Sequence, residues 1–270
     1  MLPLITDSGM AQTLQKQKEL APQRLDRLRG ILHENHVVRV DELCMQLSVS
    51  PATVRRDLEE LERLGEVRRI HGGAVLEGQR AEEPLFDDKA SIARREKFRI
   101  AEFAASLIES RDTIYLDGGS TVLELTRLIR DRSNITVVTN SLRAAWELAG
   151  GGPKLILIGG ELRRLSQTMV GALTRHLLSE LNIDKAFMGT LGLTLAEGLT
   201  TTDPAEAFTK ELVIKRAHEV IVLAHSGKVG NISFVNAGKL QDVDVLVTDR
   251  EMEDSFAREV ERQGITLYRV

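Results

Sequence analysis

Arg55 and Arg56 stand next to each other in the stretch SVSPATVRRDLEELERLG, and their guanidinium groups could contact the phosphates or guanine bases of DNA. Ser50 suits the N-cap and Pro51 the first position of a helix, so the sequence predicts a helix that begins here. Its inward face follows an i, i+4, i+7, i+10 pattern made by Val54, Leu58, Leu61 and Leu64. At about 100° per residue, the two arginines project from the opposite face, near the helix start.

Two shorter helical patterns precede this helix, and a pair of short strands follows it. The first pattern runs from Pro22 and has one apolar face, made by Leu25, Leu28, Ile31 and Leu32. The second is VDELCMQL, whose two acids suit the positive end of a helix dipole. The segment EVRRIHGGAV predicts two strands around a Gly72-Gly73 turn. Three helices and such a wing form a winged helix-turn-helix, whose third helix enters the major groove.

The residues that we expect to contact DNA lie near the start of the third helix or on the wing. They are Ser50, Thr53, Arg55, Arg56, Arg68, Arg69, His71 and Gly72. The alternative is a solvated helix whose arginines pair with neighbouring glutamates, which is a common arrangement. The other helices and the wing favour DNA binding. Nearby acids indicate modest non-specific affinity, so binding should depend on base contacts and dimerisation; these acids are Glu59, Glu60, Glu62 and Glu66.

A second distinctive stretch is LDGGSTVLELTRLI, in which an apolar run ends at Asp117 and a helical pattern begins at Ser120. Gly118 and Gly119 let the backbone approach a ligand, and the free N–H groups and dipole of a helix start favour a phosphate. The sequence therefore predicts an anion-binding loop over Asp117, Gly118, Gly119, Ser120 and Thr121. The loop matches neither G-x-x-x-x-G-K-[ST] nor G-x-G-x-x-G. The alternative is a plain turn with Ser120 as the N-cap.

Two further polar groups also follow apolar runs. Asn140, in TNS, offers an amide to a sugar, and Lys228, in LAHSGKVG, offers a positive charge. Seven apolar runs alternate with helical patterns, namely TIYLD, ITVVTN, KLILIGG, KAFMGT, EVIVLA, DVLVTD and ITLYRV. This alternation predicts an α/β domain with a largely parallel sheet covered on both faces. Ligands of such sheets bind at the carboxyl ends of the strands, where the polar motifs fall.

The composition is that of an ordinary globular protein, with 42% hydrophobic and 28% charged residues among 270. A net charge of −4 gives no overall attraction for nucleic acid, so DNA contact needs a local basic patch. The one cysteine, Cys44, excludes an intramolecular disulfide and indicates a reducing cytosol, so we expect a cytoplasmic protein. The sequence shows neither a signal sequence nor an apolar run of the ~18 residues that a membrane span needs.

Long stretches of the sequence resemble the DeoR-type bacterial transcription regulators. LSVSPATVRRDLEELERLGEVRRIHGGAV resembles their N-terminal signature, and DGGSTVLELTRLI, VVTNS, KAFMGTLGL and GLTTTDPAEA follow the motif order of their sensor domain. The resemblance implies a winged helix-turn-helix joined to a sensor domain similar to sugar-phosphate isomerases. It implies a regulator, most often a repressor, of sugar or nucleoside metabolism. It also implies that Asp117 to Thr121 bind the phosphate of a sugar effector, with Asn140 and Lys228 lining the pocket.

The chain departs from the family pattern near Lys228. The family usually has an aspartate and then a small polar residue before this lysine, where the chain has His225 and Gly227. This departure leaves the identity of the effector open. A histidine that satisfies a neighbouring backbone group is an equally simple account of His225. Lys89 stands where an arginine is more usual.

We expect four parts in the chain: a flexible extension over residues 1–21, a winged helix-turn-helix over 22–76, a linker over 77–90 and a sensor domain over 91–270. A short recognition helix reads few base pairs, so we expect a homodimer or homotetramer on paired operator half-sites. The spacing of the histidines fits no metal site, and we expect neither a metal nor another cofactor. Trp146, in LRAAWEL, is interpreted as a core or subunit-contact residue.

Two other functions fit parts of the sequence. A sugar-phosphate isomerase or deaminase needs a positioned carboxylate base, for which Asp117, Asp184 and Glu206 are candidates, but their spacing selects none. A pure oligomerisation scaffold does not require a glycine-rich anion loop. The sequence therefore favours a regulator without catalytic residues, which binds double-stranded DNA and a phosphorylated sugar or related metabolite.

Overall fold

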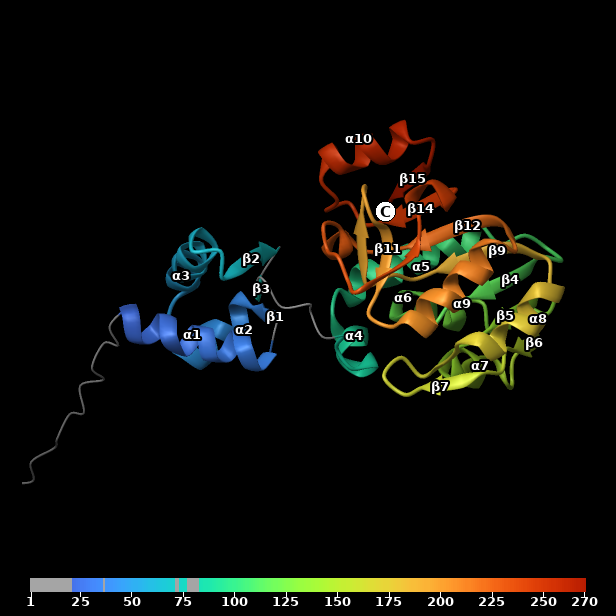
Figure 1. Ribbon diagram of the computed structural model, residues 1–270, viewed down its shortest axis with the longest axis horizontal. Helices are drawn as coiled ribbons and strands as arrows, with labels where there is room; N and C mark the ends of the chain where they lie inside the picture. The colour runs from blue at the N-terminus through green and yellow to red at the C-terminus, as the bar shows by residue number, and fades with distance from the viewer. Residues whose placement is uncertain (1–20, 36, 71–72, 77–82) are drawn as a thin grey trace, which may run out of the picture. The chain divides into compact units, whose positions relative to one another are not determined.

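The computed structural model describes residues 21–35, 37–70, 73–76 and 83–270, and the chain divides into two units, residues 1–78 and 79–270 (Figure 1). The predicted extension lies outside the described residues except for Ala21, which begins the first helix. Residues 77–82 of the predicted linker also lie outside them. Residues 83–90 of that stretch belong to the second unit, where Glu83 and Phe86 are buried.

The first unit has the three helices and the strand pair that the sequence predicts. Its elements are α1 (Ala21–Asn35), β1 (Val37–Arg39), α2 (Val40–Leu47), α3 (Pro51–Arg63), β2 (Val67–Ile70) and β3 (Gly73–Leu76). The strands form an antiparallel sheet in the order β1-β3-β2. The apolar faces of the helices meet in one core, which contains Leu28, Leu32, Leu43, Leu47, Val54, Leu58 and Leu61.

Local chemistry defines both ends of α3. The Ser50 hydroxyl accepts a hydrogen bond from the Thr53 amide at 3.3 Å, and Pro51 occupies the first turn, as predicted. Gly65 lies just beyond the helix with φ +72°, a conformation that glycine adopts without a Cβ penalty. The buried Asp57 of α3 accepts two hydrogen bonds from Arg24 of α1, at 2.5 and 2.9 Å. This ion pair fixes α3 against α1 from its inner side.

The second unit is built on a seven-stranded sheet, and all neighbouring strands in it run parallel. Its order is β15-β14-β12-β9-β4-β5-β6. The strands are β4 (Thr113–Leu116), β5 (Thr136–Thr139), β6 (Lys154–Leu157), β9 (Ile183–Met188), β12 (Ala217–Leu223), β14 (Val245–Thr248) and β15 (Thr266–Arg269). These are the seven predicted apolar runs, so the predicted fold class is confirmed.

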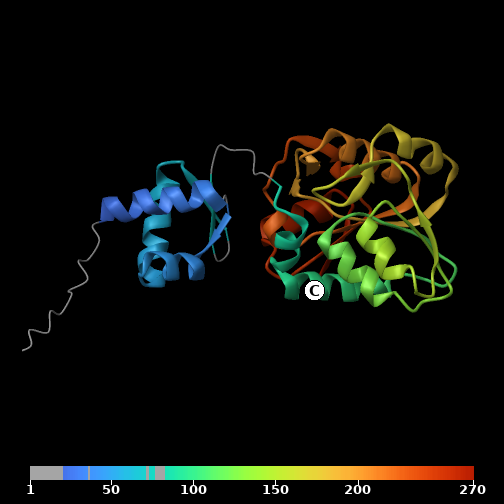
Figure 2. The ribbon, with the colours of Figure 1, turned by 90° about the horizontal axis from the view of Figure 1, so that it is seen from below.

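Helices cover both faces of this sheet. Successive residues of a strand point to opposite faces, and apolar residues on both faces need a covering layer. Ile114 and Leu116 of β4 join one core cluster with α5 (Arg94–Ser106), α6 (Ser120–Leu128) and α7 (Leu142–Leu148). Tyr115, between them, joins the other cluster with α8 (Arg175–Glu180), α9 (Pro204–Ile214) and α10 (Asp254–Arg262). Figure 2 shows the green helices on one side of the unit and α8 and α9, in yellow and orange, on the other.

Several short elements surround the main sheet and do not stand out in the sequence. They are α4 (Phe86–Ser91), the hairpin of β7 (Glu161–Arg163) and β8 (Thr168–Val170), the antiparallel sheet of β10 (Gly192–Thr194), β11 (Gly198–Thr201) and β13 (Val235–Gly238), and the 3-10 turns η1 (Ala172–Thr174), η2 (Ser226–Lys228) and η3 (Leu240–Asp242). Strands of three or four residues are too short to show a period. No helix in the described part of the chain is long and apolar enough to cross a membrane.

Candidate functional site

The outer face of α3 presents two arginines to solvent. Arg55 and Arg56 are exposed, as the helical spacing predicts, whereas Val54 and Leu58 are buried. Within the described residues, neither arginine forms an ion pair or a side-chain hydrogen bond. The solvated-helix alternative expects such pairs. The guanidinium groups are therefore free to meet a ligand.

Neighbouring charges in the same unit are paired, in contrast to these two arginines. Arg63, the last residue of α3, donates to Glu60 at 2.7 Å. Arg29 of α1 donates to Glu66 at 2.6 and 2.8 Å. These pairs occupy two of the four acids that lie close to the arginines in sequence. Arg63 is thus a natural internal control for Arg56.

The other predicted DNA contacts are placed unevenly. Ser50 and Thr53 lie at the start of α3, and their hydroxyl oxygens are 3.0 Å apart. Arg68 and Arg69 lie in β2, and nothing is described of their side chains. His71 and Gly72, at the predicted wing tip, lie outside the described residues. All eight DNA contacts stay predictions.

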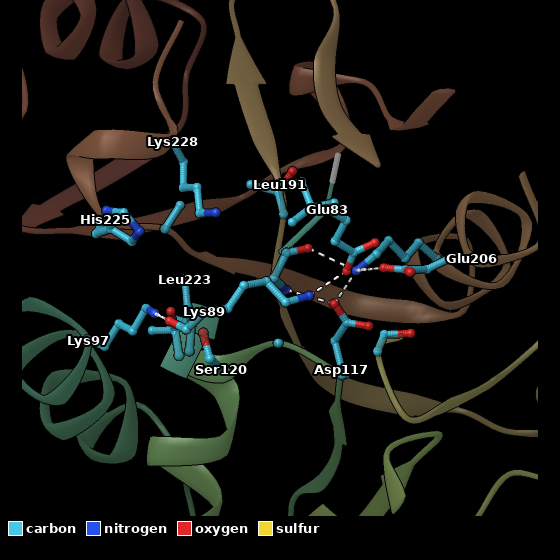
Figure 3. Close-up of a pocket in the computed structure, with 18 residues that line it drawn as sticks. Glu83, Lys89, Lys97, Asp117, Ser120, Leu191, Glu206, Leu223, His225 and Lys228 are labelled. Atoms are coloured by element: carbon cyan, nitrogen blue, oxygen red, sulfur yellow. Dashed lines mark hydrogen bonds and ion pairs between the residues drawn. The ribbon is translucent and has the colours of Figure 1, made fainter. Parts of the chain in front are cut away.

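A pocket in the second unit lies at the carboxyl ends of three adjacent strands, β4, β9 and β12 (Figure 3). Its empty volume, counted together with the open space at its mouth, is about 520 Å³. The structure brings six of the seven predicted effector residues to its wall: Asp117, Gly118, Gly119, Ser120, Thr121 and Lys228. The polar motifs at the strand ends therefore do converge.

The loop before α6 leaves backbone N–H groups without a side-chain cap. Gly119, and not Ser120, occupies the N-cap position, and no side-chain hydrogen bond caps the helix. The alternative of a plain turn capped by Ser120 is therefore wrong. Gly118 is required by packing, because a Cβ there would lie 2.0 Å from Cγ2 of Thr168. The α6 N-terminus is thus open towards the pocket, where an anion is favoured.

Two ammonium groups face this helix start without an acidic partner. Lys97 of α5 and Lys228 of η2 line the pocket, and neither forms an ion pair with any described residue. Burial, followed by the positive charges of Lys228 and Lys89, lowers the pKa of Lys97 to about 7. Burial and then the charge of Lys89 lower the pKa of Lys228 to about 8. Crowded, partly desolvated cations of this kind favour an anionic ligand.

The opposite side of the pocket is acidic, and a lysine within it balances part of this negative charge. Asp117 accepts hydrogen bonds from the Gly189 amide at 2.9 Å and from the Lys210 ammonium group, which also lies 3.7 Å from Glu206. Burial would lower the pKa of Lys210, but the charges of Asp117 and Glu206 raise it overall. Figure 3 shows Asp117 and Glu206 across the pocket from Lys97, His225 and Lys228. The pocket is therefore polarised from one side to the other.

Asn140 is the predicted effector residue that the structure does not bring to the pocket. Its side-chain amide donates to the backbone carbonyl of Met169 in β8 at 3.0 Å. The backbone amide of Met169 donates to the backbone carbonyl of Asn140 at 2.8 Å. Asn140 thus holds the β7–β8 hairpin, which carries Thr168 against Gly118. The strand-end position is as predicted, but the side chain bonds to strand β8.

His225 lines the pocket, and its imidazole is neutral near pH 7. Burial, followed by the positive charges of Lys228 and Lys97, lowers its pKa to about 3. Its side chain makes no hydrogen bond with a described residue. The account in which His225 satisfies a neighbouring backbone group is therefore not supported. A neutral imidazole in this position can donate to or accept from a ligand hydroxyl.

Sequence reasoning missed four charged residues of the pocket wall, and it placed a fifth only as a candidate base. Lys97, Lys210, Glu83 and Lys89 were not predicted, and Glu206 lies beside Lys210. The i, i+4 spacing of Glu206 and Lys210 in PAEAFTK was the available signal. Asp184, the other separate candidate base, accepts from the Thr113 amide at 2.8 Å, at the amino end of β4. It lies at the wrong end of the sheet.

The exposed Trp146 is a further correction. Its relative exposure is 84%, so it is not a core residue. It lies on α7 beside Leu142 and Arg143, in a shallow depression of the surface. Its contact with another subunit stays a prediction.

A winged helix-turn-helix joined to a parallel α/β domain defines a two-domain DNA-binding regulator. Residues 24–80 match the DeoR-like helix-turn-helix domain, and residues 92–250 match the DeoR C terminal sensor domain. The chain belongs to the DeoR family of transcriptional regulators. Membership makes the first unit a DNA-binding domain and the second a sensor domain for a small molecule. The protein is therefore a regulator and not an enzyme.

Curated relatives span almost the whole chain. An uncharacterized HTH-type transcriptional regulator, FruR of Bacillus subtilis, is 35% identical over 232 residues, which are 86% of this chain and 92% of that protein. The lactose phosphotransferase system repressor of Streptococcus mutans is 33% identical over 240 residues, 87% of this chain and 95% of that protein. Among solved structures, ribose 5-phosphate isomerase A of Methanocaldococcus jannaschii is 19% identical with a TM-score of 0.39, covering 51% of this chain and 55% of that one.

Proposed function

We propose that the protein represses genes of carbohydrate metabolism and that a phosphorylated sugar, bound in the strand-end pocket, controls its hold on the operator. One observation carries this proposal. The ammonium groups of Lys97 and Lys228, which form no ion pair with any described residue, line the same pocket as the uncapped start of α6. A phosphate dianion would neutralise both cations and accept from the free N–H groups.

The acidic side of the pocket suits the rest of such a ligand. Glu206 has a buried carboxylate oxygen, Oε2, that accepts no hydrogen bond in the described part of the chain, although it lies 3.2 Å from Nη1 of Arg163. Sugar hydroxyls are donors that could satisfy such an oxygen, and His225 can serve another hydroxyl. The polarity of the pocket therefore matches a molecule that is anionic at one end and polyhydroxylated at the other.

On DNA, we assign the base and phosphate contacts to the start of α3. Arg55 and Arg56 are exposed and form no pair within the part of the chain that the structure describes, and guanidinium groups bind guanine in a bidentate way. One short helix reads few base pairs, so two copies on paired half-sites supply the specificity. The name of the lactose phosphotransferase system repressor among the relatives supports repression and a carbohydrate connection.

Fluorescence anisotropy on a DNA fragment from the upstream region of the gene tests the proposal. We expect operator binding that a subset of sugar phosphates weakens, whereas the same sugars without phosphate have no effect. The Lys228→Met variant should still bind the operator, but its release should need about 10- to 100-fold more sugar phosphate. Operator binding that no phosphorylated sugar changes would remove the effector from the proposal. A response to the unphosphorylated sugars would mean that the effector belongs to another class of ligand.

A further inference from the structure

The chain segment from Glu83 to Ser91, here called the pocket arm, forms part of the pocket wall and is the first described stretch of the second unit. It contains α4 and follows the residues that join the two units along the chain. The Glu83 carboxylate is buried and has three partners. Lys89 donates to one oxygen, while Arg163 and Thr202 donate to the other at 2.6 and 2.7 Å.

The cations that hold the pocket arm also face the pocket. Lys89 lines the pocket with its ammonium group on Glu83, and Lys97 donates to the Lys89 carbonyl oxygen. A second set of contacts holds the outer side of the arm. Arg143 lies 4.4 Å from the centre of the Phe86 ring and 2.8 Å from Asp87. The arm is therefore attached at two places, one inside the pocket and one outside it.

We propose that the effector phosphate competes with the pocket arm for the Lys89 and Lys97 ammonium groups, so that an occupied pocket loosens the arm that leads to the DNA-binding unit. This inference rests on the proposed function and states how the bound effector would act on the segment that leads to the DNA-binding unit. An ammonium group offers three donors, but a dianion attracts it more strongly than a carbonyl oxygen or a shared carboxylate does. The competition therefore favours the ligand.

Glu83 is ionised throughout the physiological pH range, so it always competes with the effector phosphate for the Lys89 ammonium group. Burial would raise the pKa of Glu83, but Lys89, Arg163 and Thr202 together lower it to about 2. The carboxylate stays ionised across the physiological range. After Lys89 turns to a ligand, Glu83 keeps Arg163 and Thr202 as partners. We expect α4 to loosen while Glu83 itself remains in place.

Hydrogen–deuterium exchange on the full chain, with inorganic phosphate as the probe, separates the two events. The backbone amides of Ser120 and Thr121 report occupation of the anion site. The Lys89 amide, which donates to Leu85 at 3.0 Å within α4, reports the arm. We expect phosphate to slow exchange at the first pair and to speed exchange at Lys89 several-fold, relative to sodium chloride of equal ionic strength. A rise at Lys89 with slowing at the helix start supports the competition.

Glu83→Gln supplies the matching variant. In this variant the Lys89 amide should exchange fast without phosphate, and phosphate should raise its exchange rate only a little. Phosphate should still slow exchange at the amides of Ser120 and Thr121. Glu211→Gln, which breaks an exposed ion pair with Lys215 on α9, is the control and should behave like the wild type. If Glu83→Gln does not fold, Thr202→Val removes one partner of Glu83 and should give an intermediate response.

The outcomes distinguish this inference from the function on which it rests. Slowing at Ser120 and Thr121 with unchanged or slower exchange at Lys89 overturns the competition and leaves the anion site intact. No slowing at the helix start removes the anion site and the competition together. Operator binding gives a second readout. In Glu83→Gln, a phosphorylated sugar that releases the wild type should still bind but change operator affinity several-fold less.

Discussion

The two units hold their candidate binding cations in opposite environments. Arg55 and Arg56 stand exposed on α3 and have no partner among the described residues, whereas Lys97 is 3% exposed and lies in a pocket with Lys228. Exposed cations are stabilised by water, so each one adds little binding free energy. Several of them together bind a polyanion such as DNA. Buried cations are unstable alone, and this instability favours a single compact anion.

This difference predicts different sensitivities for the two ligands. DNA binding through exposed arginines should depend on salt, because counterions compete for phosphates. Effector binding through Lys97 and Lys228 should depend on pH, because their pKa values of about 7 and about 8 lie in the physiological range. The predictions below test that contrast, from the largest expected effect to the smallest.

Replacing Lys228 by methionine should have the largest effect on effector binding. The variant keeps the volume of the side chain but removes one of two unpaired cations, each worth about 1.5–3 kcal/mol in a charged hydrogen bond. We expect sugar-phosphate affinity to fall by about 10- to 100-fold in calorimetry. Lys215→Met, at an exposed pair with Glu211, is the control. Equal affinities in wild type and Lys228→Met would contradict the anion site.

Arg56→Ala should weaken operator binding with the fold intact. A bidentate contact to a base is worth about 1–3 kcal/mol, so we expect a loss of about 5- to 100-fold in anisotropy titrations. Arg63→Ala, which removes a guanidinium already paired with Glu60, should change affinity by less than about threefold. Equal losses in both variants would mean that general charge, and not the start of α3, binds DNA.

The pH profile of effector binding should fall on the alkaline side. A bound dianion favours the protonated ammonium groups, so binding takes up protons where Lys97 and Lys228 are partly neutral in the free protein. We expect affinity to decrease from about pH 6.5 to about pH 9.5, above the second ionisation of the phosphate. Calorimetry in buffers of different ionisation enthalpy measures the proton uptake. A flat profile would show that neither lysine binds the ligand.

Lys97→Met should stabilise the ligand-free protein modestly while it weakens effector binding. The folded-state pKa of about 7 lies below the reference value of 10.5, so unfolding takes up a proton between these values. The destabilisation by Lys97 is complete below about pH 7 and disappears as the pH rises to 10.5. We expect a rise in melting temperature of a few degrees at about pH 6.5. The rise should shrink at higher pH, and a uniform change would assign it to packing.

The elements of both units follow from local patterns, whereas the partners of the charged groups do not. Apolar runs and helical spacing predict the seven strands of the main sheet and the three helices of the first unit, including the Ser50 cap of α3. Strand-end positions predict most of the pocket loop. They fail for Asn140, whose side chain bonds to β8. The helical pattern fails for Trp146, which lies on the solvent side of α7.

The sequence by itself determined the kinds of element, their order and the loop residues that open α6, because these depend on spacing along one stretch of chain. Only the tertiary structure showed that two further cations, Lys97 and Lys210, join the predicted Lys228 in the pocket. Lys97, Lys210 and Lys228 come from three separate elements, and parallel strand order brings them to one end of the sheet. Whether a lysine is paired with an acid or held unpaired depends on neighbours distant in sequence. Burial and pairing set its charge, so the chemistry of the pocket arises only on folding.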